Sequence, residues 1–185
     1  MSGDPHQLRA GDLPTPFTAE EIRDGNPVGS VIRLRVERAG ADSMIHVSSY
    51  LSADERGAVR ESWDETLDGE RVGEAEQSRE TWLELQEHAS FLAGSTRIDE
   101  EVIELPIGRL ECLRYTQTTE DGTRTFWFAR DLPGQPVRWE IRSGGELVTS
   151  VEAIEVAVAI RARARPTRPG SRRAATGRCT GGASR

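Results

Sequence analysis

The sequence predicts an α+β domain that is mainly β, with a single curved antiparallel sheet of about nine strands wrapped against one amphipathic helix. Apolar and polar residues alternate with a period of two through most of residues 32–156, which is typical of strands that bury one face. Short connections rich in Gly, Pro and Asp join these segments and favour antiparallel neighbours. The helical period interrupts this pattern only at residues 81–92.

A short helix is expected before the sheet. Thr18 can cap it, because Glu21 stands three residues later at capping-box spacing. Phe17 and Ile22 have the spacing of a hydrophobic staple, and Gly25 supplies the stop. We therefore predict about two helical turns at the entry to the domain.

Nine strands follow from the two-residue alternation. Dipeptides and tripeptides suited to tight turns separate the later ones, which favours a meander. The pattern is compatible with an open half-barrel and with a closed barrel. The predicted strands cover residues 32–37, 44–52, 58–67, 70–78, 96–105, 109–119, 123–130, 136–143 and 146–156.

Two of these strands differ from the others. In 58–67 the alternation places Val59, Trp63 and Leu67 on one face. The next strand, 70–78, is mostly polar, and we expect it at an edge of the sheet.

Residues 81–92 predict the amphipathic helix. Thr81 and Glu84 have capping-box spacing, and a stripe close to 3.6 residues runs along one side. About three turns should pack on the sheet. The stripe consists of Trp82, Leu85, Ala89 and Leu92.

Charge and composition divide the chain into a flexible N-terminus (1–16), one sheet domain (17–160) and a disordered tail (161–185). All 31 acidic residues precede residue 161, whereas the tail holds eight Arg, no acid and no aromatic residue. An acidic body would repel a polyanion and the tail cannot stack on bases, so nucleic-acid association through the tail ranks last among the functions considered.

The opening residues contain neither a basic leader nor an apolar run, and no stretch approaches the length of a membrane helix. From this we expect a cytoplasmic protein. Cys112 and Cys179 are the only cysteines, one in a predicted strand and one in the tail, and we expect both as free thiols.

An aromatic stretch, TFWFARDLPGQPVRWEI at residues 125–141, forms two of the predicted strands. Trp139 shares a face with Val137 and Ile141 and is expected in the core. Phe126 and Phe128 alternate with Trp127, so both faces of the first strand are aromatic, and a one-residue slip would exchange them.

The segment CLRYTQTTEDGTRTFWFARDLPGQPVRWEIRSGGELV resembles the C-terminal half of uncharacterised bacterial sheet proteins. Over residues 96–156 it is also distantly similar to lipoprotein-carrier (LolA-like) half-barrels. In that family a curved sheet wraps a helix and forms an apolar concavity for acyl chains. The resemblance implies a concave apolar face in this chain as well.

We accordingly expect a non-catalytic module whose concave face holds an apolar small molecule or lipid-like ligand. The same aromatic side chains would also suit an ordinary core. Alternatively, the protein pairs with another chain through a sheet edge, either at residues 70–78 or at residues 125–130. The expected lining residues are Trp63, Trp82, Phe91, Phe126, Trp127 and Phe128.

No motif indicates catalysis, a cofactor or a metal. His6, His46 and His88 lack partners at metal-ligand spacing, and Cys112 has no histidine nearby in sequence. Acidic residues in strands 58–67 and 96–105 are expected in water, because the opposite faces of those strands are apolar. The nucleotide-binding and hydrolase signatures are missing from the sequence.

Overall fold

The computed structural model describes residues 4–159, which form two short helices and nine strands. In chain order these are α1 (Ala19–Gly25), β1 (Val31–Arg38), β2 (Met44–Ala53), β3 (Gly57–Glu65), β4 (Arg71–Thr81), α2 (Trp82–Glu87), β5 (Thr96–Leu105), β6 (Gly108–Thr119), β7 (Gly122–Ala129), β8 (Arg138–Ser143) and β9 (Glu146–Ala157). The predicted class, α+β with strands dominant, is confirmed.

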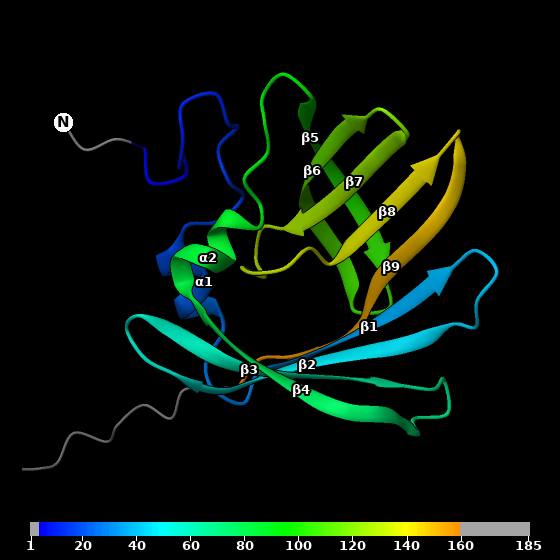
Figure 1. The fold of residues 1–185 in the computed structure, drawn as a ribbon. Helices are drawn as coiled ribbons and strands as arrows, with labels where there is room; N and C mark the ends of the chain where they lie inside the picture. Colours follow the sequence, from blue (N-terminus) through cyan, green and yellow to red (C-terminus); the bar gives the residue numbers. More distant parts are fainter. Residues whose placement is uncertain (1–3, 160–185) are drawn as a thin grey trace, which may run out of the picture.

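The nine strands make one open antiparallel sheet in the order β4-β3-β2-β1-β9-β8-β7-β6-β5. Strands β1 to β4 form one meander and β5 to β9 a second, and the pairing of β1 with β9 joins them. Figure 1 shows the two groups meeting where β9 lies beside β1 and diverging from there, with both helices in the angle between them. Within the described chain, β4 and β5 are the two edges, so the sheet does not close.

Two hydrophobic clusters fill the molecule. The cluster under the helices joins α1 and α2 to β3, β6 and β7. The other cluster joins β1, β5, β6, β7 and β9. Because successive strand residues point to opposite faces, β7 contributes Phe128 to the first cluster and Trp127 to the second. Two adjacent residues of β7 therefore belong to different clusters, and this strand connects them.

One row of paired residues crosses all nine strands, and it is mostly charged. Cross-strand partners lie on the same face, so these side chains share one face of the sheet. Opposite charges alternate along much of the row. From β5 to β4 it runs Asp99, Arg114, Trp127, Arg138, Glu152, Arg35, Ile45, Glu65 and Arg71.

The second helix is shorter than the predicted span of 81–92. It begins as expected with a capping box, in which the Thr81 hydroxyl accepts from the Glu84 N–H, but it ends at Glu87. Beyond it, residues 91–93 leave the helix to pair with residues 11–13, through Leu13 N–H to Phe91 O (2.8 Å) and Ala93 N–H to Gly11 O (3.0 Å). The prediction of three turns is wrong because the sequence does not show this distant partner.

Strand β3 is also shorter than predicted. It ends at Glu65, and Leu67 lies beyond it with 58% of its surface exposed. Leu67 therefore does not share a buried face with Val59 and Trp63. The expectation that the polar strand lies at an edge is confirmed, since β3 is the one strand of the described sheet that pairs with β4.

Residues 4–16 contact the body of the protein. The Tyr115 hydroxyl donates to Pro14 O (2.8 Å), and the Gln86 amide donates to Pro5 O and to the Thr15 hydroxyl (both 2.9 Å). The domain limits at residues 17 and 160 stay predictions. The tail assigned to 161–185 lies outside the described residues.

Candidate ligand-binding cavity

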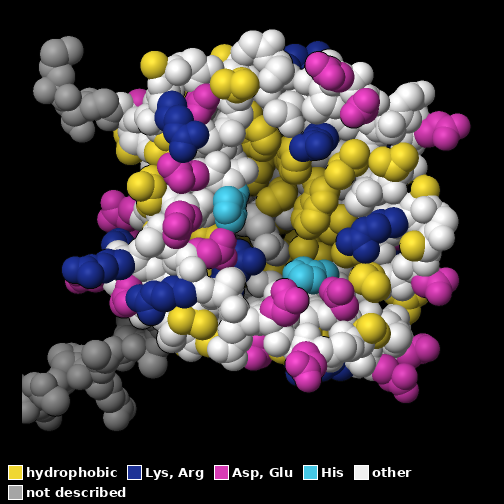
Figure 2. All heavy atoms as spheres, viewed as in Figure 1, with side chains coloured by type: hydrophobic (Ala, Val, Ile, Leu, Met, Phe, Trp, Pro, Cys, Tyr) yellow, Lys and Arg dark blue, Asp and Glu magenta, His cyan; other side chains and the backbone are white. Residues whose placement is uncertain are grey.

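A cavity of about 280 Å³ lies between the two helices and the sheet. Figure 2 shows a hollow with a hydrophobic floor in the middle of this face. Its lining comes from α1, α2, β2, β3, β7, β8 and the loop that joins β7 to β8. The lining residues are Ile22, Tyr50, Arg60, Leu85, His88, Ala89, Phe126, Phe128, Gly134, Gln135, Pro136 and Trp139.

Three aromatic side chains from β7 and β8 line the cavity. Phe126 and Phe128 point to the same face of β7, and Trp139 is the cross-strand partner of Phe126. Behind them, the Phe91 ring lies 5.3 Å from that of Phe126, centroid to centroid, and buried Tyr115 meets Phe128 edge-on at 5.4 Å. These contacts fix the aromatic rings from behind and leave their other sides toward the hollow.

Helix α2 covers the cavity. Trp82 is buried, stacks on Tyr50 at 6.2 Å and donates its indole N–H to Asp54 O (2.8 Å), which anchors the first turn on the sheet. The buried Gln86 side chain ties the helix to the N-terminal segment and accepts from the Ala19 N–H of α1 (2.9 Å). Leu85 of α2 is therefore held over the hollow.

The loop at the cavity's rim is held by one amide. Asn26 donates through Nδ2 to Pro133 O (2.7 Å) and to Ile22 O (2.8 Å), so the β7–β8 loop is tied to the end of α1. Gly134 has φ 137°, and a Cβ there would approach Asn26 Nδ2 to 3.2 Å. A side chain at Gly134 would strain this rim of the cavity.

Polar groups gather on the side of the cavity next to β3 and β4. Arg60 Nη1 lies 3.6 Å from Glu80 Oε2, and His88 Nε2 lies 3.7 Å from Glu80 Oε1. Burial raises the pKa of Tyr50, so that its phenol stays protonated at neutral pH. Gln135 brings an amide from the β7–β8 loop.

The structure brings four of the six expected lining residues together and separates the other two. Phe126 and Phe128 line the cavity, whereas Trp82 and Phe91 are buried behind it in the same cluster. The open question about the aromatic strand is resolved, because both phenylalanines, and not Trp127, face the helices.

Trp127 and Trp63 lie elsewhere, each beside a glutamate and an arginine. Trp127 donates to Glu101 Oε2 (2.9 Å) beneath the Arg138 guanidinium, at 5.0 Å from the ring centroid. Trp63 donates to Glu65 Oε1 (2.6 Å), and Arg71 lies 4.5 Å over its ring. Neither indole contributes to the cavity lining.

Sequence reasoning missed several lining residues. Trp139 was expected in the core, yet it is half-buried and lines the hollow beside Phe126. The sequence did carry a signal for Trp139. A short turn joins its strand to the aromatic strand that holds Phe126, so the two strands are expected to pair. Arg60, His88 and Gln135 gave no signal, because only the fold brings β3, α2 and the β7–β8 loop together.

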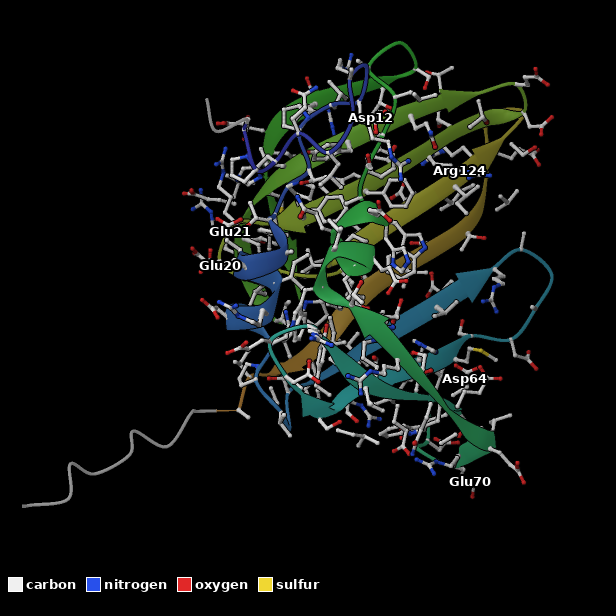
Figure 3. The ribbon with its side chains drawn as sticks, turned by 60° about the vertical axis from the view of Figure 1, so that its left-hand side comes forward. Asp12, Glu20, Glu21, Asp64, Glu70 and Arg124 are labelled. Carbon is white, nitrogen blue, oxygen red and sulfur yellow. The ribbon has the colours of Figure 1, made fainter. Side chains whose placement is uncertain are left out.

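The other residues considered for chemistry lie in separate parts of the structure. His46 Nδ1 lies 2.8 Å from Asp64 Oδ1, at the β2–β3 pair. Figure 3 shows Asp64 and Glu70 near the β3–β4 hairpin, far from Glu20 and Glu21 on α1. Burial raises the pKa of Cys112 to about 11, which keeps it as an unreactive thiol at neutral pH.

Among residues 4–159, no group of three or more His, Cys, Asp or Glu side chains is placed to hold a metal ion. The helices of that same part of the chain are all too short and too polar to cross a membrane.

No protein-family model matches the chain, and no curated protein matches its sequence. Similarity is found at the level of solved structures. Two crystal structures of MucB match at 12% identity, one of MucB alone (TM-score 0.53) and one of MucB in complex with MucA(peri) (TM-score 0.52). The alignments cover 82% and 83% of this chain but only 61% and 59% of the MucB chains.

A putative outer membrane lipoprotein-sorting protein domain from Vibrio parahaemolyticus matches with 10% identity and TM-score 0.28, over 75% of this chain and 89% of that one. The distant resemblance to half-barrel sheet proteins predicted from residues 96–156 is confirmed at the level of the fold.

The expected cytoplasmic location is contradicted by the comparison with MucB. MucB, which shares the fold over most of this chain, was solved in complex with MucA(peri). The expectation rested on the residues that open the given sequence, and those residues do not determine the compartment in which a fold of this kind works.

Proposed function

We propose that this protein is a non-catalytic binding module that holds an apolar small molecule in the cavity beneath α2. The observation that carries the proposal is the hollow of about 280 Å³, whose aromatic walls are fixed from behind while their inner sides stay uncovered. Ligand sites are commonly concave and apolar with a few polar groups, and this cavity has that composition.

The size of the cavity favours a slender ligand. Its volume lies just below the range of about 300–1,000 Å³ that is usual for ligand pockets. A single alkyl chain or a small ring system suits this volume better than a molecule with several acyl chains. Burial of ~300 Å² of apolar surface contributes about 7 kcal/mol, offset by at least ~4 kcal/mol for association. We therefore expect dissociation constants in the millimolar range.

Binding can be measured with N-phenyl-1-naphthylamine, a neutral probe whose emission rises in apolar surroundings. The wild-type protein should bind the probe at one saturable site. Leu85→Trp should weaken binding at least tenfold, because the larger ring fills the hollow from α2. Leu83→Trp is the matched control: it lies in the same helix, but Leu83 is 51% exposed and does not line the cavity.

Both variants should unfold at temperatures close to that of the wild type, which separates a filled cavity from a lost fold. Equal loss of probe binding in the two folded variants would contradict the proposal. A wild-type protein without saturable probe binding would contradict it directly.

A second candidate function is supported by the position of β4. Among residues 4–159 this strand of eleven residues pairs on one side only, and an unpaired strand edge can add a strand from another chain. The solved complex of MucB with MucA(peri) suggests that a fold of this kind can serve a protein partner. Edge pairing through the aromatic strand is wrong, because β7 is paired on both sides.

Charges on β4 disfavour nonspecific pairing at this edge. If self-association through β4 is the function, mass in solution should rise with protein concentration, and Gln77→Pro should abolish the rise. A constant monomeric mass would leave the cavity as the functional site.

A further inference from the structure

The two edges of the sheet differ in how their charges are paired. On β5, Asp99 and Glu101 both form ion pairs with Arg114 (2.9 Å each), and Glu100 pairs with Arg130. Around β4, several exposed carboxylates have no side-chain partner among residues 4–159. These are Glu55, Asp68, Glu70, Glu74 and Glu76. The β4 edge therefore carries negative charge that the described part of the chain does not neutralise.

The region that contains β4 is strongly acidic as a whole. Residues 54–87, which include β3, β4 and α2, hold twelve acidic residues and four arginines, a net charge of −8. The arginines are already engaged: Arg79 pairs with Asp54 (2.8 Å), for example, and Arg71 lies over the Trp63 ring. A field of one sign attracts a partner of the opposite sign and repels a like one.

Exposed apolar side chains lie at both ends of this edge. Leu67 (58% exposed) and Val72 (47% exposed) lie at the hairpin where β4 begins, and Leu83 (51% exposed) follows directly after β4 ends. Figure 3 shows Glu70 at the same hairpin, on the side away from α2. Side chains of this kind can add specificity to main-chain pairing at an edge.

The backbone of β4 limits where a strand can be added. Residues 73–75 oppose Trp63 alone, and Gly73 has a φ of 76°, so a bulge interrupts the ladder there. Residues 76–81 pair with β3 without a shift in register. This regular half of β4 is the part that can receive another strand.

A second copy of this chain is a poor partner for the edge. Two-fold antiparallel pairing centred on Ser78 would set Glu76 of each chain opposite Glu80 of the other. Like charges directly opposite one another destabilise a strand pair. The net charge of the surrounding region would oppose the approach of a second copy in other registers as well.

We propose that the β4 edge binds an extended segment of a different protein, with arginine or lysine at alternate positions and an apolar residue at each end. Its main chain would pair with residues 76–81, its basic side chains would lie beside Glu74 and Glu76, and its ends would reach toward Val72 and Leu83. This inference rests on the second candidate function, pairing at β4, and specifies the partner. It does not depend on the cavity.

The probe for this inference is the fluorescein-labelled decapeptide LRTRTRTRTL, which is about 33 Å long when extended. Fluorescence anisotropy measures its binding to the full chain. Two further peptides are compared with it: one has glutamate in place of every arginine, and the other has N-methyl groups on all its inner amides. We expect the glutamate peptide to bind at least tenfold more weakly, and the N-methylated peptide not to bind.

The variant with Glu74→Gln and Glu76→Gln should bind the arginine peptide about three- to tenfold more weakly, as the loss of two cross-strand charge pairs implies. Glu104→Gln is the matched control, because Glu104 is an exposed glutamate on the other edge strand, β5, and its loss should leave binding unchanged. Thermal unfolding verifies that both variants are folded. Leu85→Trp, which fills the cavity, should bind the peptide as the wild type does.

The outcomes separate the edge from its partner. Equal binding of the N-methylated peptide, or no binding of the arginine peptide to the wild type, would overturn pairing at β4 and the inference with it. Equal binding of the glutamate peptide, or an unchanged affinity in the Glu74→Gln, Glu76→Gln variant, would overturn the basic character of the partner alone. A mass that rises with protein concentration would identify a second copy as the partner and would also overturn the inference.

Discussion

At the scale of single residues, Trp127 is held by neighbouring side chains and does not line the cavity. Trp127 is 7% exposed. Its indole N–H donates to Glu101, and the Arg138 guanidinium lies over its ring. Its aromatic character drew attention to it in the sequence. An indole combines a large apolar surface with a single donor. In Trp127 the apolar ring packs in the core, and the N–H makes one charge-assisted hydrogen bond.

Trp127→Phe should lower the free energy of unfolding by about 1–2 kcal/mol, since it removes the hydrogen bond to Glu101 and leaves that carboxylate with one donor fewer. Urea denaturation followed by circular dichroism measures the change. Probe binding in the cavity should match the wild type. A large loss of binding without a loss of stability would show that Trp127 contacts the ligand.

Cys112 illustrates how burial decides the reactivity of a thiol. The residue is 1% exposed, and burial raises its pKa to about 11, with a further contribution from the Glu101 charge. At pH 8 the side chain is therefore the neutral thiol, which is a poor nucleophile.

Iodoacetamide at pH 8 should leave Cys112 unmodified in the native protein and should alkylate it within minutes in denaturant. Trypsin cuts after arginine, so the peptide spanning 110–114 reports on this cysteine by mass. Rapid alkylation of that peptide in the native protein would show that the site opens to solvent.

At the scale of elements, the capping box of α2 positions the cover of the cavity. A helix of six residues has little stability of its own, so its ends and its buried face must hold it. Thr81 and Glu84 satisfy one another's backbone N–H groups, at 2.7 Å for the Thr81 N–H to Glu84 Oε2 and 3.1 Å for the reverse contact.

Thr81→Ala should lower the free energy of unfolding by about 1 kcal/mol and should also weaken probe binding, because Leu85 is carried by this helix. Thr18→Ala, which removes the equivalent capping box of α1, is the control for capping in general. It should cost a similar amount of stability with a smaller effect on binding. Equal effects of both substitutions on binding would argue against a special role for α2.

The charged row makes the sheet sensitive to acid. The pKa of Glu65 is lowered chiefly by the hydrogen bond from Trp63 and also by Arg33, and the pKa of Asp99 is lowered chiefly by Arg114. A carboxyl group whose folded-state pKa lies below its unfolded value adds stability above the unfolded pKa. That stability is lost as the pH falls through the folded pKa.

We therefore expect the unfolding temperature to fall as the pH drops below about 4.5, the ordinary value for a glutamate. Glu65→Gln should reduce stability at pH 7 and should flatten this acid dependence. Glu61→Gln, on the same strand, is the comparison variant. An unchanged slope in Glu65→Gln would show that other carboxylates carry the acid sensitivity.

At the scale of the whole molecule, β9 connects the two halves. It pairs with β8 of its own meander and with β1 of the other, so the sheet is continuous only through this strand. The cavity depends on the same connection, because its lining combines β2 and β3 with β7 and β8.

Removal of residues 146–185 should abolish cooperative unfolding and probe binding together, as seen by calorimetry and fluorescence. Removal of 161–185 alone should leave both unchanged, as the predicted domain boundary at residue 160 requires. Cooperative unfolding in the longer deletion would show that each meander folds independently.

Much of the fold was readable from the sequence because its signals are local. Two-residue alternation and turn residues placed the strands within a few positions, and the Thr–x–x–Glu pairs marked both helix starts, since each depends on neighbours within about four residues. The polarity of residues 70–78 was enough to assign an edge. Alternation also required that Trp127 and Phe128 face opposite ways, although it left open which of them turns toward the helices.

Only the tertiary structure decided which residues form the candidate site. The end of α2 depends on pairing between residues 91–93 and 11–13, and the cavity depends on the β1–β9 pairing that brings Arg60 near Gln135 and Trp139. Such contacts join residues far apart in the chain, and the alternation within one strand is the same whichever strand lies beside it. The sequence thus determined the elements and their buried faces, and the pairing of distant strands determined the hollow between them.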